Sequence, residues 1–264
     1  MSELNIDGRL AADEAGEGTP VVLLHGLTAT RRYVVMGSKN LERNGHRVIA
    51  YDARGHGRSA PANAYGYDVL AADLEAVLDD RGIERAVLAG ASMGAHTIVR
   101  FALEHPERAA ALVLITPAYD PDKPERDLER WDRLSHGLRD GGVEGFLEAY
   151  GEPRVPEPFR ETVRTVLRQR LSAHEHPDAV ADALREVPRS HAFESWDDLG
   201  RLDLAVTVVA SRDEADPEHP FATGERYAEA IPSAQFVSED PGKSPLAWQG
   251  GQLSRVIAET AARH

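Results

Sequence analysis

The apolar residues of this sequence are grouped in short, uninterrupted runs that are rich in valine, isoleucine and leucine. Runs without polar alternation are typical of strands covered on both faces, as in a parallel sheet. The pattern therefore predicts strands at 20–24, 47–51, 86–89, 111–115, 205–210 and, as a weaker run, 235–237.

Between these runs lie amphipathic stretches with helical spacing, for which we predict helices at 69–80, 93–105 and 224–230. Strands that alternate with helices are the mark of an α/β protein. We therefore expect a mostly parallel central sheet that is flanked by helices.

One long stretch, 119–201, departs from this alternation. It is highly charged, contains several prolines and has helical segments but no convincing strand. We predict a helical lid (cap), inserted late in the sheet and packed over the strand ends. The core would then comprise 1–118 and 202–264. The alternative interpretation is a helical decoration on the surface with no part in the site.

Composition and charge narrow the class of protein. The chain has 264 residues, of which 42% are hydrophobic, and a formal net charge of -14, which disfavours binding to nucleic acid or to an anionic membrane surface. It contains no cysteine, so disulfides, thiolate metal sites and a cysteine nucleophile are excluded. We found neither a leader-like start nor an apolar run of about 20 residues, and we expect a cytoplasmic protein.

The most informative motif follows the predicted strand at 86–89. Gly90-Ala91-Ser92-Met93-Gly94 has the pattern Gly-x-Ser-x-Gly and leads into a predicted helix, as in a nucleophile elbow. Such a turn is tight, so small residues are needed on either side of the serine. Ser92 is the candidate nucleophile, and the backbone N–H of Met93 would face an oxyanion formed on attack.

Two upstream segments also end predicted strands. His25-Gly26-Leu27 follows the first one, and the N–H of Leu27 could supply a second oxyanion donor. Asp52-Ala53-Arg54-Gly55-His56-Gly57-Arg58-Ser59 follows the next. This block lacks the Gly-Lys-Ser/Thr of a phosphate loop, so we interpret it as a hydrogen-bonded structural corner.

Taken together, these motifs resemble the α/β-hydrolase superfamily, in its group of lidded esterases, carbon–carbon bond hydrolases and haloperoxidase-like proteins. The resemblance spans essentially the whole chain. It implies that Ser92 is the nucleophile and that Leu27 and Met93 form the oxyanion hole. It places the catalytic acid after a late strand, at Asp213, with Asp216 as the alternative acid.

The family's catalytic histidine is missing from the expected position. The loop after the last strand, 238–245, has Lys243 where the family has histidine. Lysine has an ordinary pKa of about 10.4 and is protonated near neutral pH. Lys243 is therefore a candidate general base only if burial lowers its pKa by roughly 3.4 units, and the alternative is a solvated loop lysine. An ionised Asp213 beside Lys243 would raise the lysine pKa further.

Several histidines could replace the missing base, and His219, soon after Asp216, is the first alternative. We expect His25 to have a structural place in the oxyanion loop and His96 to pack internally. His191 has no specific support. The pair His174-x-His176 has a spacing that splays its side chains apart on a helix, so we predict no metal there.

Two functional hypotheses follow. The first is a serine-dependent hydrolase that acts on a small or medium ester, or a related acyl substrate, through an acyl-enzyme, with no cofactor and no metal. The same scaffold also admits acyl-transfer or lyase chemistry that uses Lys243. The second is a catalytically impaired or silent member of the fold that binds a small molecule. The oligomeric state is left open.

Overall fold

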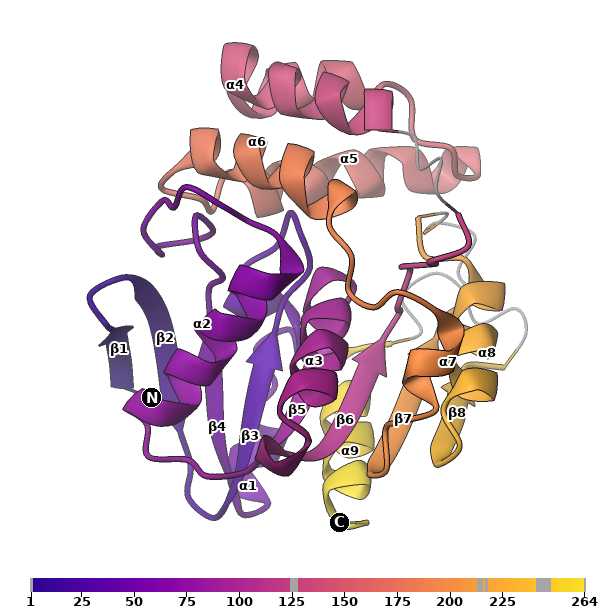
Figure 1. Ribbon diagram of the computed structural model, residues 1–264. Helices are drawn as coiled ribbons and strands as arrows, with labels where there is room; N and C mark the ends of the chain where they lie inside the picture. Colours follow the sequence, from indigo (N-terminus) through magenta and orange to yellow (C-terminus); the bar gives the residue numbers. More distant parts are fainter. Residues whose placement is uncertain (1, 124–127, 213–215, 217, 241–247, 264) are drawn as a thin grey trace.

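A twisted eight-stranded sheet forms the centre of the computed structural model, which describes residues 2–123, 128–212, 216, 218–240 and 248–263 (Figure 1). The strand order is β1-β2-β4-β3-β5-β6-β7-β8. The pairings β1/β2 and β2/β4 are antiparallel, and those from β4 through β8 are parallel. The strands are β1 Ser2–Ile6, β2 Leu10–Ala15, β3 Thr19–Leu24, β4 His46–Tyr51, β5 Ala86–Ala91, β6 Ala109–Ile115, β7 Ala205–Ala210 and β8 Ala234–Ser238.

The predicted mostly parallel α/β sheet is confirmed, and each predicted strand lies within β3–β8. The sequence pattern missed β1 and β2. These strands form the antiparallel edge of the sheet, and β2 contains Asp13 and Glu14 among its small residues. An edge hairpin is not buried on both faces, so it does not need the continuous apolar run by which the other strands were recognised.

Two layers of helices explain why the inner strands are apolar at every position. In β3, Val22 and Leu24 face the apolar cluster formed with α2 and α3, whereas Val21 and Leu23 face the cluster formed with α9. Figure 1 shows these helices on opposite faces of the sheet. The flanking helices are α1 Asn40–Arg43, α2 Tyr67–Asp80, α3 Met93–Glu104, α8 Phe221–Ala230 and α9 Gly250–Ala261.

Three helices from the stretch 119–201 lie above the carboxyl ends of the parallel strands (Figure 1): α4 Leu128–Tyr150, α5 Glu157–Leu171 and α6 Pro177–Glu186. They have their own apolar cluster, which includes Leu138, Phe146 and Leu184. α4 is broken at Gly142, where φ is 60°. We call this three-helix layer the lid.

The last helix of the same stretch, α7 Trp196–Leu199, packs beside the sheet instead of above it. The centre of its Trp196 ring lies 5.3 Å from the centre of the Tyr227 ring in α8.

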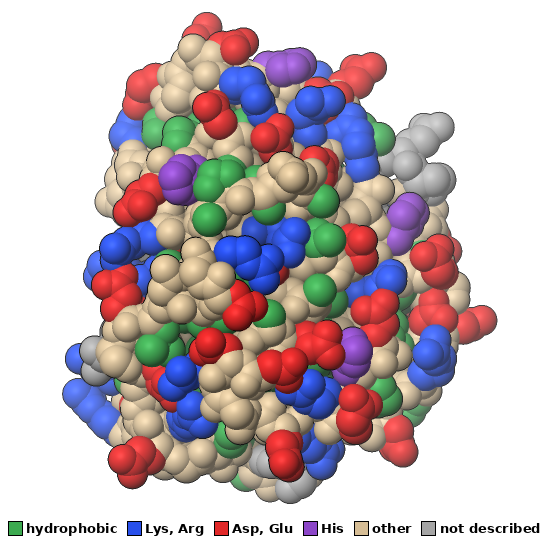
Figure 2. All heavy atoms as spheres, turned by 60° about the vertical axis from the view of Figure 1, so that its left-hand side comes forward, with side chains coloured by type: hydrophobic (Ala, Val, Ile, Leu, Met, Phe, Trp, Pro, Cys, Tyr) green, Lys and Arg blue, Asp and Glu red, His purple; other side chains and the backbone are tan. Residues whose placement is uncertain are grey.

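Acidic and basic side chains are interspersed over the face shown in Figure 2. Within the described ranges, no helix is long and apolar enough to cross a bilayer.

Candidate active site

Ser92 occupies a strained position at the turn between β5 and α3. Its backbone has φ 49° and ψ -113°, a conformation that non-glycine residues rarely adopt. The Ser92 N–H donates a hydrogen bond of 2.9 Å to the carbonyl of Ile115, at the end of β6. This bond ties the strained turn to the neighbouring strand. Strain of this kind is retained at functional sites when the surrounding structure over-determines it.

The two glycines of the motif let backbone segments cross at close range. A Cβ on Gly90 would lie 2.3 Å from the carbonyl carbon of Gly94, and one on Gly94 would lie 2.3 Å from the carbonyl oxygen of Leu24. These obstacles are backbone atoms and cannot rotate away. The close packing predicted from the motif is therefore what holds β3, β5 and α3 together beneath Ser92.

We expect Gly94→Ala to lower the free energy of unfolding by about 2–3 kcal/mol, because the added methyl group overpacks a rigid crossing. Gly141→Ala is the matched control, since a Cβ there has no neighbour within 4 Å. Urea unfolding of both variants measures the difference. Equal stability of the two variants would show that the crossing relaxes without cost.

The loop after β3 reaches the same turn. A Cβ on Gly26 would lie 3.5 Å from the Cβ of Ser92, so this loop passes directly beside the candidate nucleophile. Leu27 packs against both the core and the lid clusters. In the described part of the chain, no hydrogen-bond acceptor is found for the N–H of Leu27 or of Met93. Two uncommitted donors near Ser92 are what an oxyanion hole requires.

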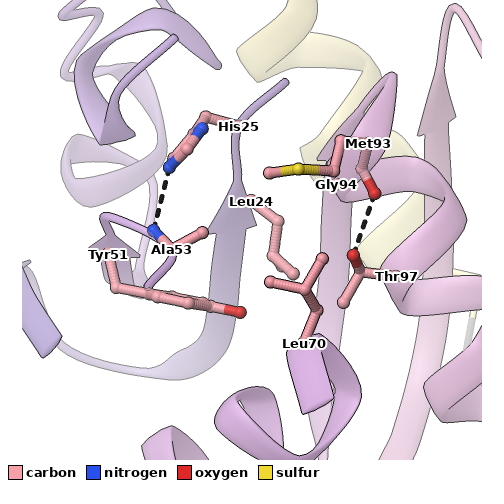
Figure 3. A pocket seen from close by; sticks show the side chains of 8 residues that line it. All are labelled: Leu24, His25, Tyr51, Ala53, Leu70, Met93, Gly94 and Thr97. Carbon is pink, nitrogen blue, oxygen red and sulfur yellow. Dashed lines mark hydrogen bonds between the residues drawn. The ribbon is translucent and has the colours of Figure 1, made fainter. Parts of the chain in front are cut away.

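A small hollow lies on the core side of this turn, lined by Leu24, His25, Tyr51 and Met93 among others (Figure 3). It has room for about one water molecule. Its apolar lining and its size do not suit a substrate. The hollow is therefore a packing defect beneath the turn.

His25 and His96 are both committed to hydrogen bonds within the fold. His25 Nε2 accepts from the N–H of Ala53 at 2.9 Å (Figure 3), and its Nδ1 lies 2.8 Å from the carbonyl of Gly26. Burial, followed by the neighbouring His56, lowers the pKa of His25 well below its usual value. His96 Nε2 accepts from the N–H groups of Ala118 and Tyr119. Neither ring is available as a base for Ser92.

The corner after β4 is an ionic and hydrogen-bonded structure. Asp52 is buried and accepts from the backbone N–H groups of Arg31 and Arg58, and it also pairs with the Arg31 guanidinium. Arg54 forms a two-point ion pair with Asp73 of α2, at 2.7 and 2.8 Å. These bonds hold the loop after β4 in place, as expected for a structural corner.

On the other side of Ser92, the segment after β7 contains a paired acid and base. His219 Nδ1 lies 2.8 Å from both carboxylate oxygens of Asp216. Burial raises the pKa of Asp216, but the charges of His219 and Arg170 outweigh it, and the pKa is lowered overall. Asp213 and Lys243 lie outside the described residues. Within the described residues, the Ser92 hydroxyl has no hydrogen-bond partner.

A further strained residue, Thr116, was not found from the sequence. It follows β6 and has φ 44°, and its N–H donates to the carbonyl of Val209 at 2.7 Å. A positive φ is a genuine outlier for a β-branched residue. No motif in the sequence marks this position.

His174, between α5 and α6, joins the lid to the loops after β3 and β4. Its Nε2–H donates to the carbonyl of Thr28 at 3.2 Å, and its Nδ1 accepts from the N–H of Gly57 at 2.8 Å. The ring stands edge-on to His56, whose Nε2 is 2.6 Å from the carbonyl of Leu27. Burial, and then the neighbouring His56, lowers the pKa of His174 to about 4.

This junction predicts a loss of stability in mild acid. Between about pH 6.5 and the folded-state pKa of about 4, the unfolded chain binds a proton at His174 and the folded chain does not. Lowering the pH through this window therefore favours unfolding, by at most about 3 kcal/mol from this group. His174→Gln should reduce the pH slope, measured by urea unfolding at successive pH values.

The matched control for this prediction is His136→Gln, which alters an exposed lid histidine. It should leave the slope unchanged. His25 and His56 also have lowered pKa values, so part of the slope will persist in His174→Gln. An unaltered slope in His174→Gln would contradict the assigned role.

Comparison with known proteins places this geometry in a family. The model of the alpha/beta hydrolase fold matches residues 19–203, which is most of the chain. The chain belongs to the alpha/beta hydrolase fold family. The resemblance seen in the sequence is thus confirmed at the level of the superfamily. The replacement of the catalytic histidine by Lys243 stays a prediction.

Individual members of the family show the range of similarity. The 2-hydroxy-6-oxononadienedioate/2-hydroxy-6-oxononatrienedioate hydrolase 2 of Pseudomonas putida is 30% identical over 249 residues, covering 89% of this chain and 85% of that protein. The AB hydrolase superfamily protein YisY of Bacillus subtilis is 28% identical over 164 residues, and the chain spans only 59% of its length.

Among solved structures, a thermophilic esterase from Thermogutta terrifontis, described as malate bound, is 29% identical with a TM-score of 0.75. The match covers 99% of this chain and 95% of that one. These hydrolase and esterase relatives confirm the prediction that this family member is a hydrolase.

No cluster of three or more histidine, aspartate or glutamate side chains that could hold a metal occurs in the described ranges.

Proposed function

We propose that this family member is a serine-dependent hydrolase of small or medium esters, with Ser92 as the nucleophile. The observation that carries the proposal is the strained backbone of Ser92, φ 49°, at a strand-to-helix turn. Uncommitted N–H groups of Leu27 and Met93 support it. A residue that only ended a strand would need neither the strain nor the donors.

The proposed reaction proceeds in two halves. The Ser92 oxygen attacks the ester carbonyl carbon while its proton passes to a base, and the carbonyl oxygen becomes an oxyanion that accepts from Leu27 and Met93 N–H. Collapse of this intermediate breaks the bond to the alcohol, which leaves with the proton. Water then attacks the acyl-enzyme and releases the acid and Ser92.

Two groups compete for the role of the base, and they act at different pH. Lys243 has the position implied by the family resemblance, beside Asp213, whereas His219 is oriented by Asp216 through Nδ1. With a histidine base, kcat/KM should rise with pH around pH 6.5, about the ordinary pKa of histidine. With a lysine base, the rise should come around pH 10. The pH profiles of His219→Gln and Lys243→Gln therefore assign the role.

The proposal is tested by turnover of p-nitrophenyl butyrate together with labelling by a fluorophosphonate. We expect labelling at Ser92 and release of p-nitrophenol in proportion to enzyme. Even with a poor base, an oxyanion hole and substrate binding retain roughly 10³–10⁴ of rate enhancement. Absence of both labelling and turnover from mildly acidic to strongly basic pH would instead identify a silent, ligand-binding member of the fold.

A further inference from the structure

The carboxylate of Glu239, directly after β8, joins three segments of the chain. Its Oε1 accepts hydrogen bonds from the Ser211 hydroxyl, at 2.9 Å, and from the backbone N–H of Arg212. Its Oε2 accepts one from the indole N–H of Trp248, just before α9, at 3.0 Å. Hydrogen bonds to an ionised acceptor are stronger than those between neutral groups, so a single side chain holds these segments together.

This junction continues the sheet beyond its last backbone pair. Strands β7 and β8 run parallel and side by side (Figure 1), and their register ends with Ala210 opposite Ser238. Ser211 and Glu239 are the next residues of the two strands, and here a side chain makes the link that the backbone made before. The two chains therefore leave the sheet from a common point.

The same edge of the sheet carries Ser92. The N–H of Ser92 is bonded to Ile115, at the end of β6, and the N–H of Thr116 is bonded to Val209 in β7. Glu239 extends this series of contacts from β7 to β8. Hydrogen bonds thus link the carboxyl edge of the sheet from the candidate nucleophile to the junction at Glu239.

The segment after β7 carries the candidate acids. Asp213 directly follows Arg212 in the sequence, and Asp216, the acid of the described acid–base pair, lies farther along. Glu239 binds the backbone of Arg212, whereas the Arg212 guanidinium lies 3.9 Å from the centre of the Phe221 ring. The carboxylate therefore fixes the course of the chain at this point instead of pairing with the neighbouring charge.

The segment after β8 carries the candidate base Lys243. In the sequence, Lys243 lies between Glu239 and Trp248, which are joined by the carboxylate–indole bond. The same indole N–H also donates to the carbonyl of Ala210, at 3.3 Å. Proton transfer depends on the placement of the base, and a displacement of about 1 Å can cost about 10²-fold in rate.

We propose that Glu239 is a positioning residue for the transfer of the Ser92 proton. Its carboxylate sets where the segments that carry the candidate acids and bases leave the sheet. This inference rests on the proposed ester hydrolysis at Ser92. Both carboxylate oxygens are occupied by donors of the protein, so the loss of Glu239 should act on kcat and not on substrate binding.

The test is the pH dependence of p-nitrophenyl butyrate turnover by Glu239→Ala. We expect kcat to fall by about 10- to 100-fold on the high-pH side of the profile, where the base is neutral, and KM to change by less than about twofold. On the low-pH side, where the base is protonated, the variant and the wild-type protein should have equal rates. The rise of kcat with pH should therefore be flattened in the variant.

Three further variants separate the hydrogen bonds from the negative charge. Asp240→Asn removes the charge of the exposed next residue and should change kcat by less than about twofold. Ser211→Ala leaves the bonds from Arg212 and Trp248 in place and should have a similarly small effect. Glu239→Gln keeps a carbonyl oxygen for the donors after β7 but presents an N–H group to the indole, so its loss of kcat should be intermediate.

A purely structural role for Glu239 predicts a different profile. Glu239→Ala would then lose the same factor in kcat at every pH, or none, and either result overturns the inference. Circular dichroism checks the folding of Glu239→Ala, and Glu239→Gln provides the same comparison if the first variant does not fold.

A measurement without turnover tests the hydrogen bonds themselves. In ¹H–¹⁵N NMR spectra, Glu239→Ala should shift the indole N–H resonance of Trp248, whereas Asp240→Asn should leave it in place; no shift in Glu239→Ala overturns the inference. Wild-type protein that neither hydrolyses the ester nor is labelled by a fluorophosphonate overturns the proposed function, and the role of Glu239 with it. An active wild-type protein with an unchanged profile in Glu239→Ala overturns that role alone.

Discussion

Ser92→Ala is expected to lower kcat/KM for p-nitrophenyl butyrate by about 10³-fold or more and to abolish labelling by a fluorophosphonate. The reason is that the acyl-enzyme cannot form without the Ser92 oxygen, whereas the oxyanion donors and the binding surface stay in place. Alanine tolerates the backbone at φ 49° about as well as serine does, so the turn should be preserved. Steady-state kinetics and intact-mass analysis measure the two effects.

The control for this variant is a second serine in the same sheet region. Ser211 follows β7, and its hydroxyl donates to Glu239 at 2.9 Å. Ser211→Ala should retain labelling and most of the activity. Labelling that persists in Ser92→Ala would assign the nucleophile to another residue and would remove the basis of the proposed mechanism.

Lys243→His is expected to raise kcat/KM at pH 7 by about 10²-fold. At this pH only about 1 in 2,500 lysine side chains of ordinary pKa is neutral, whereas an imidazole with a pKa of about 6.5 is mostly neutral. General base catalysis by a well-placed side chain contributes about 10²–10⁴ in rate, so a histidine at position 243 should increase kcat/KM substantially. The measurement is the pH dependence of ester turnover in both proteins.

Lys243→Gln separates the gain of a base from the loss of a charge. It should show no increase in rate, because an amide cannot accept the Ser92 proton. If Lys243→His also shows no increase, the position does not hold the family's base, and the pair His219–Asp216 becomes the group to test. A rise in both variants would mean that the positive charge itself impedes the reaction.

The parts of this fold that could be predicted from the sequence are those set by local composition. A doubly covered strand is largely apolar, so β3 through β7 were recognisable from their runs, whereas β8, at the partly exposed edge of the sheet, gave only a weak run. The turn at Ser92 was recognisable because Gly90 and Gly94 are required by backbone contacts at 2.3 Å. Both signals lie within a few residues of the feature that they specify.

What could not be predicted depends on contacts between distant segments. Strand β2 pairs with β4, which lies far from it in the sequence, and Thr116, with its positive φ, is bonded through its N–H to the carbonyl of Val209 in β7. Likewise, the position of Arg170 over the Tyr33 ring, with its Nε unpartnered in the described part of the chain, is visible only in the folded structure. Arginines of the same helix look alike in the sequence, and only the fold distinguishes Arg170 from Arg168.

The single imidazole of His174 touches two loops at once, through the Thr28 carbonyl and the Gly57 amide. Any motion that lifts this corner of the lid must break both bonds, and Thr28 is the immediate neighbour of Leu27. In the proposed mechanism, lifting this corner would therefore also disturb the loop whose Leu27 N–H is expected to stabilise the oxyanion. If the proposed mechanism holds, the position of the lid and the geometry of the oxyanion donors are linked through one side chain, and a form with the lid lifted is expected to be less active.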